Sequence, residues 1–217
     1  MRKQRPRGTT TREAVVAAAL KVVDDAGLEG LTIRAVATKV GAPPMSLYAH
    51  FTNKEQLLDL MYTEVAHRMY ADTRHPTWQM ELTALCHQIR ALLRQHPRWI
   101  PLLSRPAHGS SVPLRERLLK MMVSEGMSPE LALTSVSSGI VVTIGLVLTE
   151  LNLRDPEGQP AVAKRFERLR GWLESNGAAD SPITLAAMTK TKKLDLDAIH
   201  AFTIRALIAG VAQQQAN

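Results

Sequence analysis

Few side chains in this sequence have the types and the spacing that catalysis or metal binding requires. Cys86 is the only cysteine, and it stands next to His87. Adjacent residues of a helix point apart, so this pair is poorly placed to act as nucleophile and base. Four further histidines are scattered, without an i, i+4 partner or a carboxylate at metal-ligand spacing: His67, His96, His108 and His200. We therefore expect no catalytic site, no metal and no cofactor, and an α-helical enzyme is kept as an alternative.

Positive charge is concentrated near the start of the chain. Lys and Arg outnumber Asp and Glu by 27 to 20, which gives a net charge of +7 and a pI near 9.9. The first 54 residues contain nine of the basic and four of the acidic residues, so +5 of the +7 lies there. A local positive field of this kind suits a polyanion such as nucleic acid. The most basic part is an N-terminal arm that could follow a phosphate strand or a minor groove: Arg2, Lys3, Arg5, Arg7 and Arg12.

Other features bear on the compartment. A single cysteine excludes an internal disulfide and fits a reducing environment. The basic arm is followed by a polar-interrupted amphipathic stretch, which is not the apolar core of a signal peptide. The longest apolar run, from Ile140 to Leu148, is about half of the roughly 18 residues that a membrane span needs. We expect a cytoplasmic protein in which this run is a buried helix. A peripheral membrane protein or a sequence-independent nucleic-acid coat that uses the arm is a second alternative.

The spacing of apolar residues predicts an all-α fold. Thr10 and Glu13 form a potential capping box for a first helix that ends at Gly27. Thr32 can cap a short second helix that stops at Gly41, and Pro44 suits the first position of a third helix that runs to about Phe51. Two short helices joined by a glycine-containing turn make a helix-turn-helix.

Longer helices follow this motif. The first of them begins at Asn53 or Lys54 and ends near Pro76. The periodicity then predicts helices over residues 78–95, 98–104, 114–125, 129–150, 161–174 and 196–213, and glycine, proline, aspartate and serine predict loops over 152–160 and 175–193. We expect three parts: the arm over 1–12, a helix-turn-helix domain over 13–56, and a larger helical domain over 57–217.

The helix-turn-helix residues resemble the tetracycline-repressor (TetR) family of bacterial transcription regulators. The resemblance covers the first quarter of the chain and rests on Leu31 to Arg34, Val36-Ala37, Val40-Gly41, Pro44 to Phe51 and Asn53 to Leu58. A weaker likeness to the ligand-binding half of tetracycline-repressor-like proteins continues over residues 95–99 and 139–150. It implies a regulator that binds a palindromic operator as a homodimer and is released by a small molecule.

The second helix of such a motif enters the major groove with its first residues at the base edges. Here these are Pro44, Met45 and Ser46. The stretch from Pro44 to Phe51 contains no Arg, Lys, Asn or Gln, so it cannot form a bidentate contact with a base, and contacts with thymine methyl groups remain. The resemblance places Arg34 where it can reach a base from the preceding helix, and a bidentate contact with guanine discriminates by about 1–3 kcal/mol.

Further residues match family positions that contact the DNA backbone. They are Tyr48, His50 and Lys54, and Thr32 begins a helix whose amide groups favour a phosphate. Such contacts fix the register and do not read sequence. Leu47 and Phe51 are expected in the core. Pro43 stands where many relatives have a capping residue, so a cap hydroxyl is missing there.

The C-terminal half is similar to a bundle that dimerises through two late helices and encloses a ligand pocket. The candidate dimer helices run from Pro129 to Glu150 and from Leu196 to Gln213. A two-fold dimer would set its recognition helices about 34–36 Å apart, which matches successive major grooves. Mostly apolar walls with few polar groups describe ligand cavities; the candidates are Trp99, Leu103, Met121, Met122, Ile140, Thr143, Ile144 and Val147.

Overall fold

The computed structural model describes residues 10–71, 74–105, 112–153, 161–177, 181–191 and 195–215. These residues form helices and turns and contain no strand, so the predicted all-α fold is confirmed. The chain divides into two compact units, Met1–Val136 and Ser137–Asn217. The arm over residues 1–9 and residues 154–160 of one predicted loop lie outside the described residues. The functional division at residue 57 stays a prediction.

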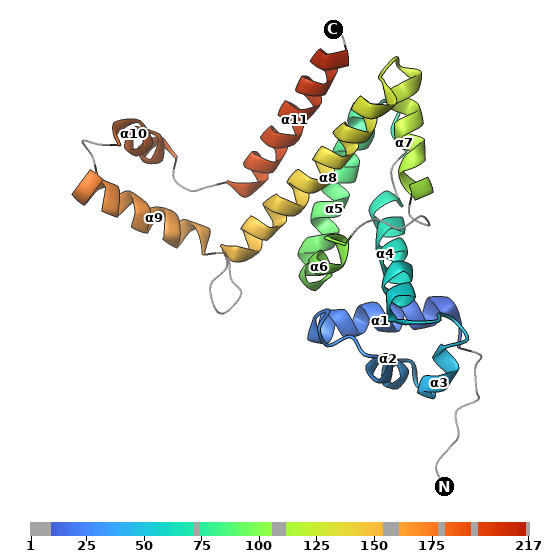
Figure 1. Ribbon diagram of the computed structural model, residues 1–217. Coiled ribbons are helices and arrows are strands. Elements are labelled where there is room, and N and C mark those ends of the chain that lie inside the picture. Colours follow the sequence, from blue (N-terminus) through green and yellow to red (C-terminus); the bar gives the residue numbers. More distant parts are fainter. Residues whose placement is uncertain are drawn as a thin grey trace. The chain divides into compact units, whose positions relative to one another are not determined.

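The first unit begins with a small head of three helices: α1 (Arg12–Ala26), α2 (Ile33–Val40) and α3 (Pro44–Leu47) (Figure 1). The predicted capping box is wrong by one residue, because Thr11 is the cap and its Oγ1 accepts a hydrogen bond of 3.2 Å from the Ala14 amide. Thr32 caps α2 as predicted, with 3.1 Å between its Oγ1 and the Ala35 amide nitrogen. Gly41 ends α2 at a φ of +75°, in the left-handed region that favours glycine.

Helix α3 is shorter than predicted. It ends at Leu47 and not near Phe51, because the next amides bond three residues back and not four. The Ala49 amide reaches the Ser46 carbonyl at 3.4 Å, and the His50 amide reaches the Leu47 carbonyl at 2.9 Å. Residues 48–50 therefore form a hydrogen-bonded turn after α3.

A buried apolar cluster holds the head together. Leu47 and Phe51 are at most 2% exposed, as predicted for core residues. They share the interior with side chains of α1, α2 and the following helix: Val15, Ala19, Val23, Leu31, Val36, Ala37 and Leu57.

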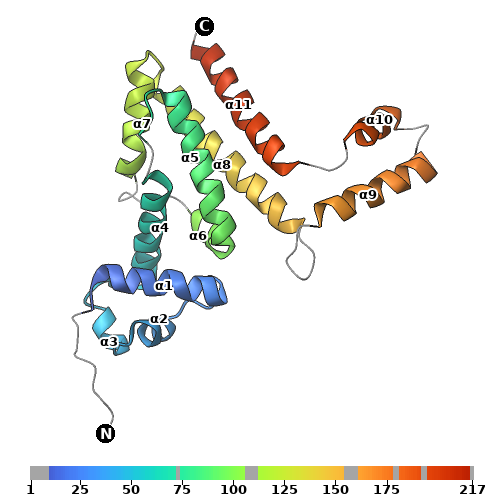
Figure 2. The ribbon, with the colours of Figure 1, turned by 180° about the vertical axis from the view of Figure 1, so that it is seen from behind.

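Helix α4 (Lys54–Tyr70) leads out of the head and packs against α1, α5 and α7 (Figures 1 and 2). Asn53 starts it, since its Oδ1 accepts a 2.9 Å hydrogen bond from the Gln56 amide. The helix ends several residues before the predicted limit at Pro76. The rest of the first unit comprises α5 (Trp78–Gln95), the 3-10 helix η1 (Pro97–Trp99), α6 (Ile100–Leu103), α7 (Val112–Ser124) and the start of α8.

The second unit is built from most of α8 (Pro129–Asn152), α9 (Val162–Trp172), the π-helical turn η3 (Leu173–Gly177), α10 (Pro182–Lys190) and α11 (Leu196–Gln215). Helix α10 lies in the segment predicted as a loop. Its local sequence explains it, because Pro182 is suited to the first helical turn and the apolar residues from Leu185 to Met188 follow.

Helix α8 corrects the prediction of a short, buried apolar run. By length and composition alone, its 24 residues could cross a membrane, and 33% of its most apolar window is buried. Val141 on α8 is 68% exposed, and Phe202 on α11 is 66% exposed. One helix of this kind is weak evidence for a membrane span. Within the described part of the chain, both helices therefore carry exposed apolar side chains.

Truncating Leu47 tests whether burial anchors the four-residue α3. Leu47→Ala should lower the free energy of unfolding by about 2–5 kcal/mol, as for other buried leucines. Met45→Ala is the matched control, because Met45 lies in the same helix and is 78% exposed; its effect should stay within about 0.5 kcal/mol. Urea titration followed by circular dichroism measures both, and equal losses would contradict the assigned anchor.

Candidate nucleic-acid interface

The sequence-predicted residues of the helix-turn-helix lie on α2, on α3 with its following turn, and at the start of α4. All of them are exposed except the half-buried His50: Thr32, Arg34, Pro44, Met45, Ser46, Tyr48 and Lys54. Their arrangement follows from the caps and the Gly41 turn, which fix where each short helix begins. The first unit therefore carries all eight predicted DNA-contacting residues on its head.

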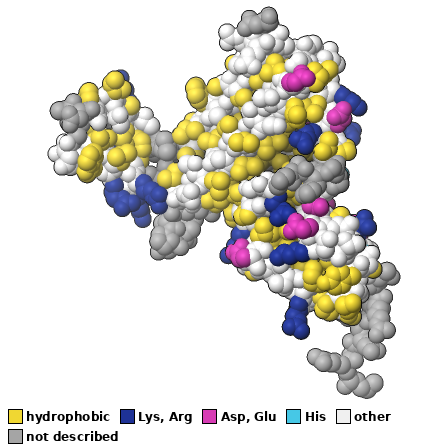
Figure 3. Space-filling model, viewed as in Figure 1, with side chains coloured by type: hydrophobic (Ala, Val, Ile, Leu, Met, Phe, Trp, Pro, Cys, Tyr) yellow, Lys and Arg dark blue, Asp and Glu magenta, His cyan; other side chains and the backbone are white. Residues whose placement is uncertain are grey.

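The surface over α3 is apolar and offers few proton donors. Figure 3 shows hydrophobic side chains gathered there, and Met45 is 78% exposed. Pro44 has no amide hydrogen. The Ser46 hydroxyl donates to the Pro43 carbonyl at 2.7 Å, so its oxygen keeps only acceptor capacity toward a base. Pro43 supplies no side-chain cap to the amides at the start of α3.

Tyr48 and Arg34 flank this apolar surface with polar groups. The Tyr48 ring packs against Phe51 with centroids 5.8 Å apart and is 46% exposed, so the core fixes its position. Arg34 is exposed on α2, where its carbonyl accepts a 2.9 Å hydrogen bond from the Thr38 hydroxyl. A phenol and a guanidinium can bind phosphate oxygens, and the guanidinium can also read guanine.

The starts of α2 and α4 carry amide donors as well as side chains. The Thr32 hydroxyl oxygen accepts a hydrogen bond from the Ala35 amide as the α2 cap, and the predicted contact of this position with DNA is through the amide groups of the helix terminus. Lys54 is the first residue of α4 and is exposed. A lysine beside the positive end of a helix dipole suits a phosphate. The neighbouring Glu55 forms an ion pair with Arg105, which follows α6.

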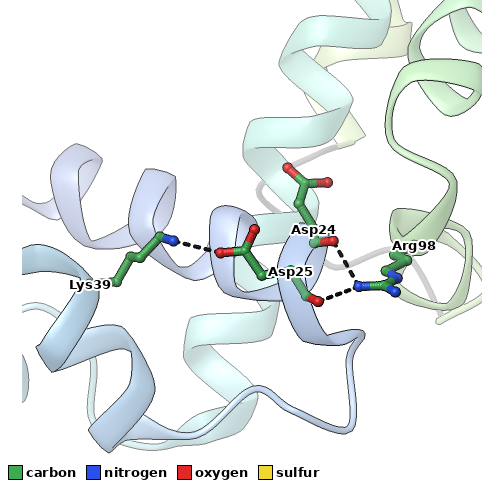
Figure 4. Close-up of polar contacts among 4 residues, drawn as sticks. All are labelled: Asp24, Asp25, Lys39 and Arg98. Carbon is green, nitrogen blue, oxygen red and sulfur yellow. Dashed lines mark hydrogen bonds and ion pairs between the residues drawn. The ribbon is translucent and has the colours of Figure 1, made fainter.

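A polar cluster at the end of α1 was missed by sequence reasoning. We call it the α1 clamp and define it by Asp24, Asp25, Lys39, His96 and Arg98. Figure 4 shows all of these except His96. Lys39 Nζ lies 2.5 Å from an oxygen of Asp25. Arg98 Nη1 donates to the main-chain oxygens of Asp24, at 3.0 Å, and of Asp25. His96 Nδ1 lies 3.0 and 3.1 Å from the two carboxylate oxygens of Asp24.

Electrostatics explains the composition of the clamp. Asp24 and Asp25 stand at the negative end of the α1 dipole, and the last turn of α1 contains no basic residue. The hydrogen bond from Lys39 lowers the pKa of Asp25 below its ordinary value, and the charges of Lys39, Lys21 and Arg98 act in the same direction. The one signal in the sequence was this unbalanced acidic pair.

The residues predicted to line a ligand pocket are divided between the two units. In the first unit Trp99 and Met122 are buried, and Leu103 and Met121 are half-buried. Trp99 stacks on His96 with 3.8 Å between ring centroids, and its indole nitrogen has no hydrogen-bond partner in the described part of the chain. On α8 the remaining four share one helical face; Thr143 and Val147 are buried, and Ile140 and Ile144 are half-buried. The Thr143 hydroxyl also has no partner among the described residues.

Metal binding finds no support in the geometry. Across the described ranges, no three side chains of His, Cys, Asp and Glu come together as a potential metal site.

Two family models match the chain in succession. The model described as bacterial regulatory proteins, tetR family, matches residues 15–61, and the tetracyclin repressor-like C-terminal domain matches residues 71–215. Together they cover the head and both compact units.

Known proteins are similar over most of the chain. The HTH-type transcriptional repressor DrrR1 of Streptomyces coeruleorubidus is 36% identical over 66% of this chain and 53% of its own length. The class D tetracycline repressor protein of Escherichia coli is 33% identical over 64% of this chain and 66% of its own length. The chain thus spans about half and just under two thirds of these relatives. ActR of Streptomyces coelicolor in complex with actinorhodin shares the fold, with a TM-score of 0.78, 22% identity and coverage of 97% of this chain and 100% of ActR.

Proposed function

The chain belongs to the tetR family of bacterial regulatory proteins, and we propose that it is a cytoplasmic repressor that binds a palindromic operator as a homodimer until a small molecule releases it. The observation that carries this proposal is the exposed surface of α3 beside Arg34 and Lys54. A helix whose apolar first residues can contact base edges in the major groove, with cations on either side, is suited to double-stranded DNA.

We infer a division of labour on this surface. Met45 and Pro44 are suited to thymine methyl groups, Ser46 to accepting a hydrogen bond from a base amino group, and Arg34 to guanine. Tyr48, His50 and Lys54 are suited to phosphates, together with the α2 terminus at Thr32. The half-site should therefore combine a guanine with a run that contains thymine.

A second copy of the chain is the proposed partner for α8 and α11. Uncovered apolar side chains on two long helices match an interface that buries them in a dimer. The same interface explains why α8 is apolar enough to resemble a membrane span. The predicted segments from Pro129 to Glu150 and from Leu196 to Gln213 fall within these two helices.

The proposed effector binds beside the predicted pocket residues of α8. The buried hydroxyl of Thr143 is a donor without a partner among the described residues. Buried polar groups are normally satisfied, so this hydroxyl favours a ligand that carries an acceptor oxygen. An effector can shift the protein away from DNA only by binding the released conformation more tightly.

Arg34 and Lys54 should differ in their effect on DNA recognition. In vitro selection of bound duplexes first gives the half-site, its spacing and its symmetry. Arg34→Ala should then cost about 1–3 kcal/mol against the selected site and relax the preference for its guanine, whereas Lys54→Ala should weaken binding to all duplexes alike. Quantitative gel shifts at fixed salt measure both. Identical behaviour of the two variants, or selection without any preferred sequence, would favour a sequence-independent coat.

Charge on the exposed face of α8 should separate the dimer. Val141→Glu is expected to give monomers in light scattering and to reduce operator affinity by about 10²–10⁴-fold, because the two heads no longer bind as one unit. Ile183→Glu is the matched control, since Ile183 on α10 is 84% exposed; it should stay dimeric. A Val141→Glu protein that remains dimeric would contradict this interface.

The Thr143 hydroxyl should matter for the effector and not for DNA. Actinorhodin and tetracycline serve as probes, because similar proteins are named for or bound to them. Thr143→Val should weaken release from the operator by the releasing compound up to about tenfold, as for one lost hydrogen bond, at unchanged operator affinity. Thr134→Val, on the exposed side of α8, should release like the wild type. A Thr143→Val protein that also behaves like the wild type would place the effector elsewhere.

A further inference from the structure

We propose that His96 and Arg98 are positioning residues for operator binding, acting through Asp24 and Asp25 to hold α1 at the angle the DNA requires. The inference rests on the proposed function as a DNA-binding regulator. In this proposal, the part of the first unit that follows α4 controls the position of the head through the α1 clamp.

Helix α1 cannot stabilise its own end. Asp24 and Asp25 place two carboxylates at the negative end of the helix dipole, where cations are favoured, and no base lies in that turn. Lys39 of α2 compensates Asp25 from within the head. The carboxylate of Asp24 and the main-chain oxygens of Asp24 and Asp25 are bound from outside the head, by His96 and Arg98 in the segment after α5. The local rule that basic residues end a helix is not obeyed here, because another element supplies the cation.

Arg98 binds the backbone, and His96 binds a side chain, of the last turn of α1. The last carbonyls of a helix lack partners within it, and one guanidinium nitrogen of Arg98 bridges two of them, those of Asp24 and Asp25. The imidazole of His96 donates from Nδ1 to the carboxylate of Asp24. A turn held at its main chain and at its side chain cannot rotate without breaking both contacts.

The His96 ring is held in place by a buried tryptophan. Its ring stacks on Trp99 at 3.8 Å with an interplanar angle of 6°, and Trp99 is 1% exposed. The Arg68 guanidinium of α4 lies 5.4 Å from the centre of the Trp99 ring and is paired with Glu64 at 2.9 Å. Any ligand that displaces Trp99 must therefore also displace the imidazole that holds Asp24.

The experiment measures operator affinity by quantitative gel shifts at fixed pH and ionic strength. His96→Gln and Asp24→Asn should each weaken operator binding by about three- to tenfold, as for the loss of one half-buried hydrogen bond. The double variant should lose no more than either single variant, because both changes remove the same contact. His67→Gln, at an exposed histidine on α4, should bind like the wild type.

Arg98 supplies a second test. Arg98→Ala should weaken operator binding by about tenfold, and Arg98→Lys should recover part of the loss, because charge returns without the bridging geometry. Thermal unfolding of each variant reports whether the fold is intact, and the isosteric Asp24→Asn keeps the test available if Arg98→Ala does not fold.

The outcomes separate this inference from the function on which it rests. A His96→Gln or Arg98→Ala protein that folds and binds the operator like the wild type overturns the clamp while operator binding stands. Absence of sequence-specific binding by the wild type overturns the proposed function itself.

Discussion

The burial of Leu47 and Phe51 determines what the head can present to a partner. A helix of four residues has almost no stability of its own, because forming the first turn costs more than its hydrogen bonds return. Helix α3 is therefore held by its one buried side chain, by the turn that follows it, and by the core formed with α1, α2 and α4. Met45, Ser46 and Tyr48 are placed correctly only because the residues between and after them are buried.

Much of the fold was predictable because its signals are local. Caps, glycine stops and apolar spacing involve residues within four positions of each other, and they placed α2, α5 and most of α8. The errors also have local causes. Thr10 and Thr11 offer the same hydroxyl, and the amide geometry chose Thr11; the glycine and serine around residue 177 concealed the short helix from Pro182. The end of α3 depended on a change from four-residue to three-residue hydrogen bonding, which no residue type announces.

The candidate site was also predictable only in part. The exposed DNA-facing residues could be named from the sequence, since a helix-turn-helix fixes their places by short spacing. The α1 clamp could not, because Asp24 and His96 are 72 residues apart. Similarly, periodicity shows that α8 is apolar but cannot tell whether its own chain covers it. An interior helix, a membrane span and an interface helix have the same composition, and only the exposure of Val141 and its neighbours distinguishes the first from the other two.

The α1 clamp has a consequence for protein engineering. Transferring a DNA-binding head from one regulator to another assumes that all residues that stabilise the head lie in one continuous N-terminal segment. Here Lys39 pairs with Asp25 inside the head, but the groups that bind Asp24 and the last main-chain oxygens of α1 come from a segment far along the sequence. A hybrid that receives only residues 10–56 would leave the Asp24 carboxylate and these oxygens without their partners. Successful chimeras should therefore transplant residues 96–99 together with the head, as one discontinuous cassette.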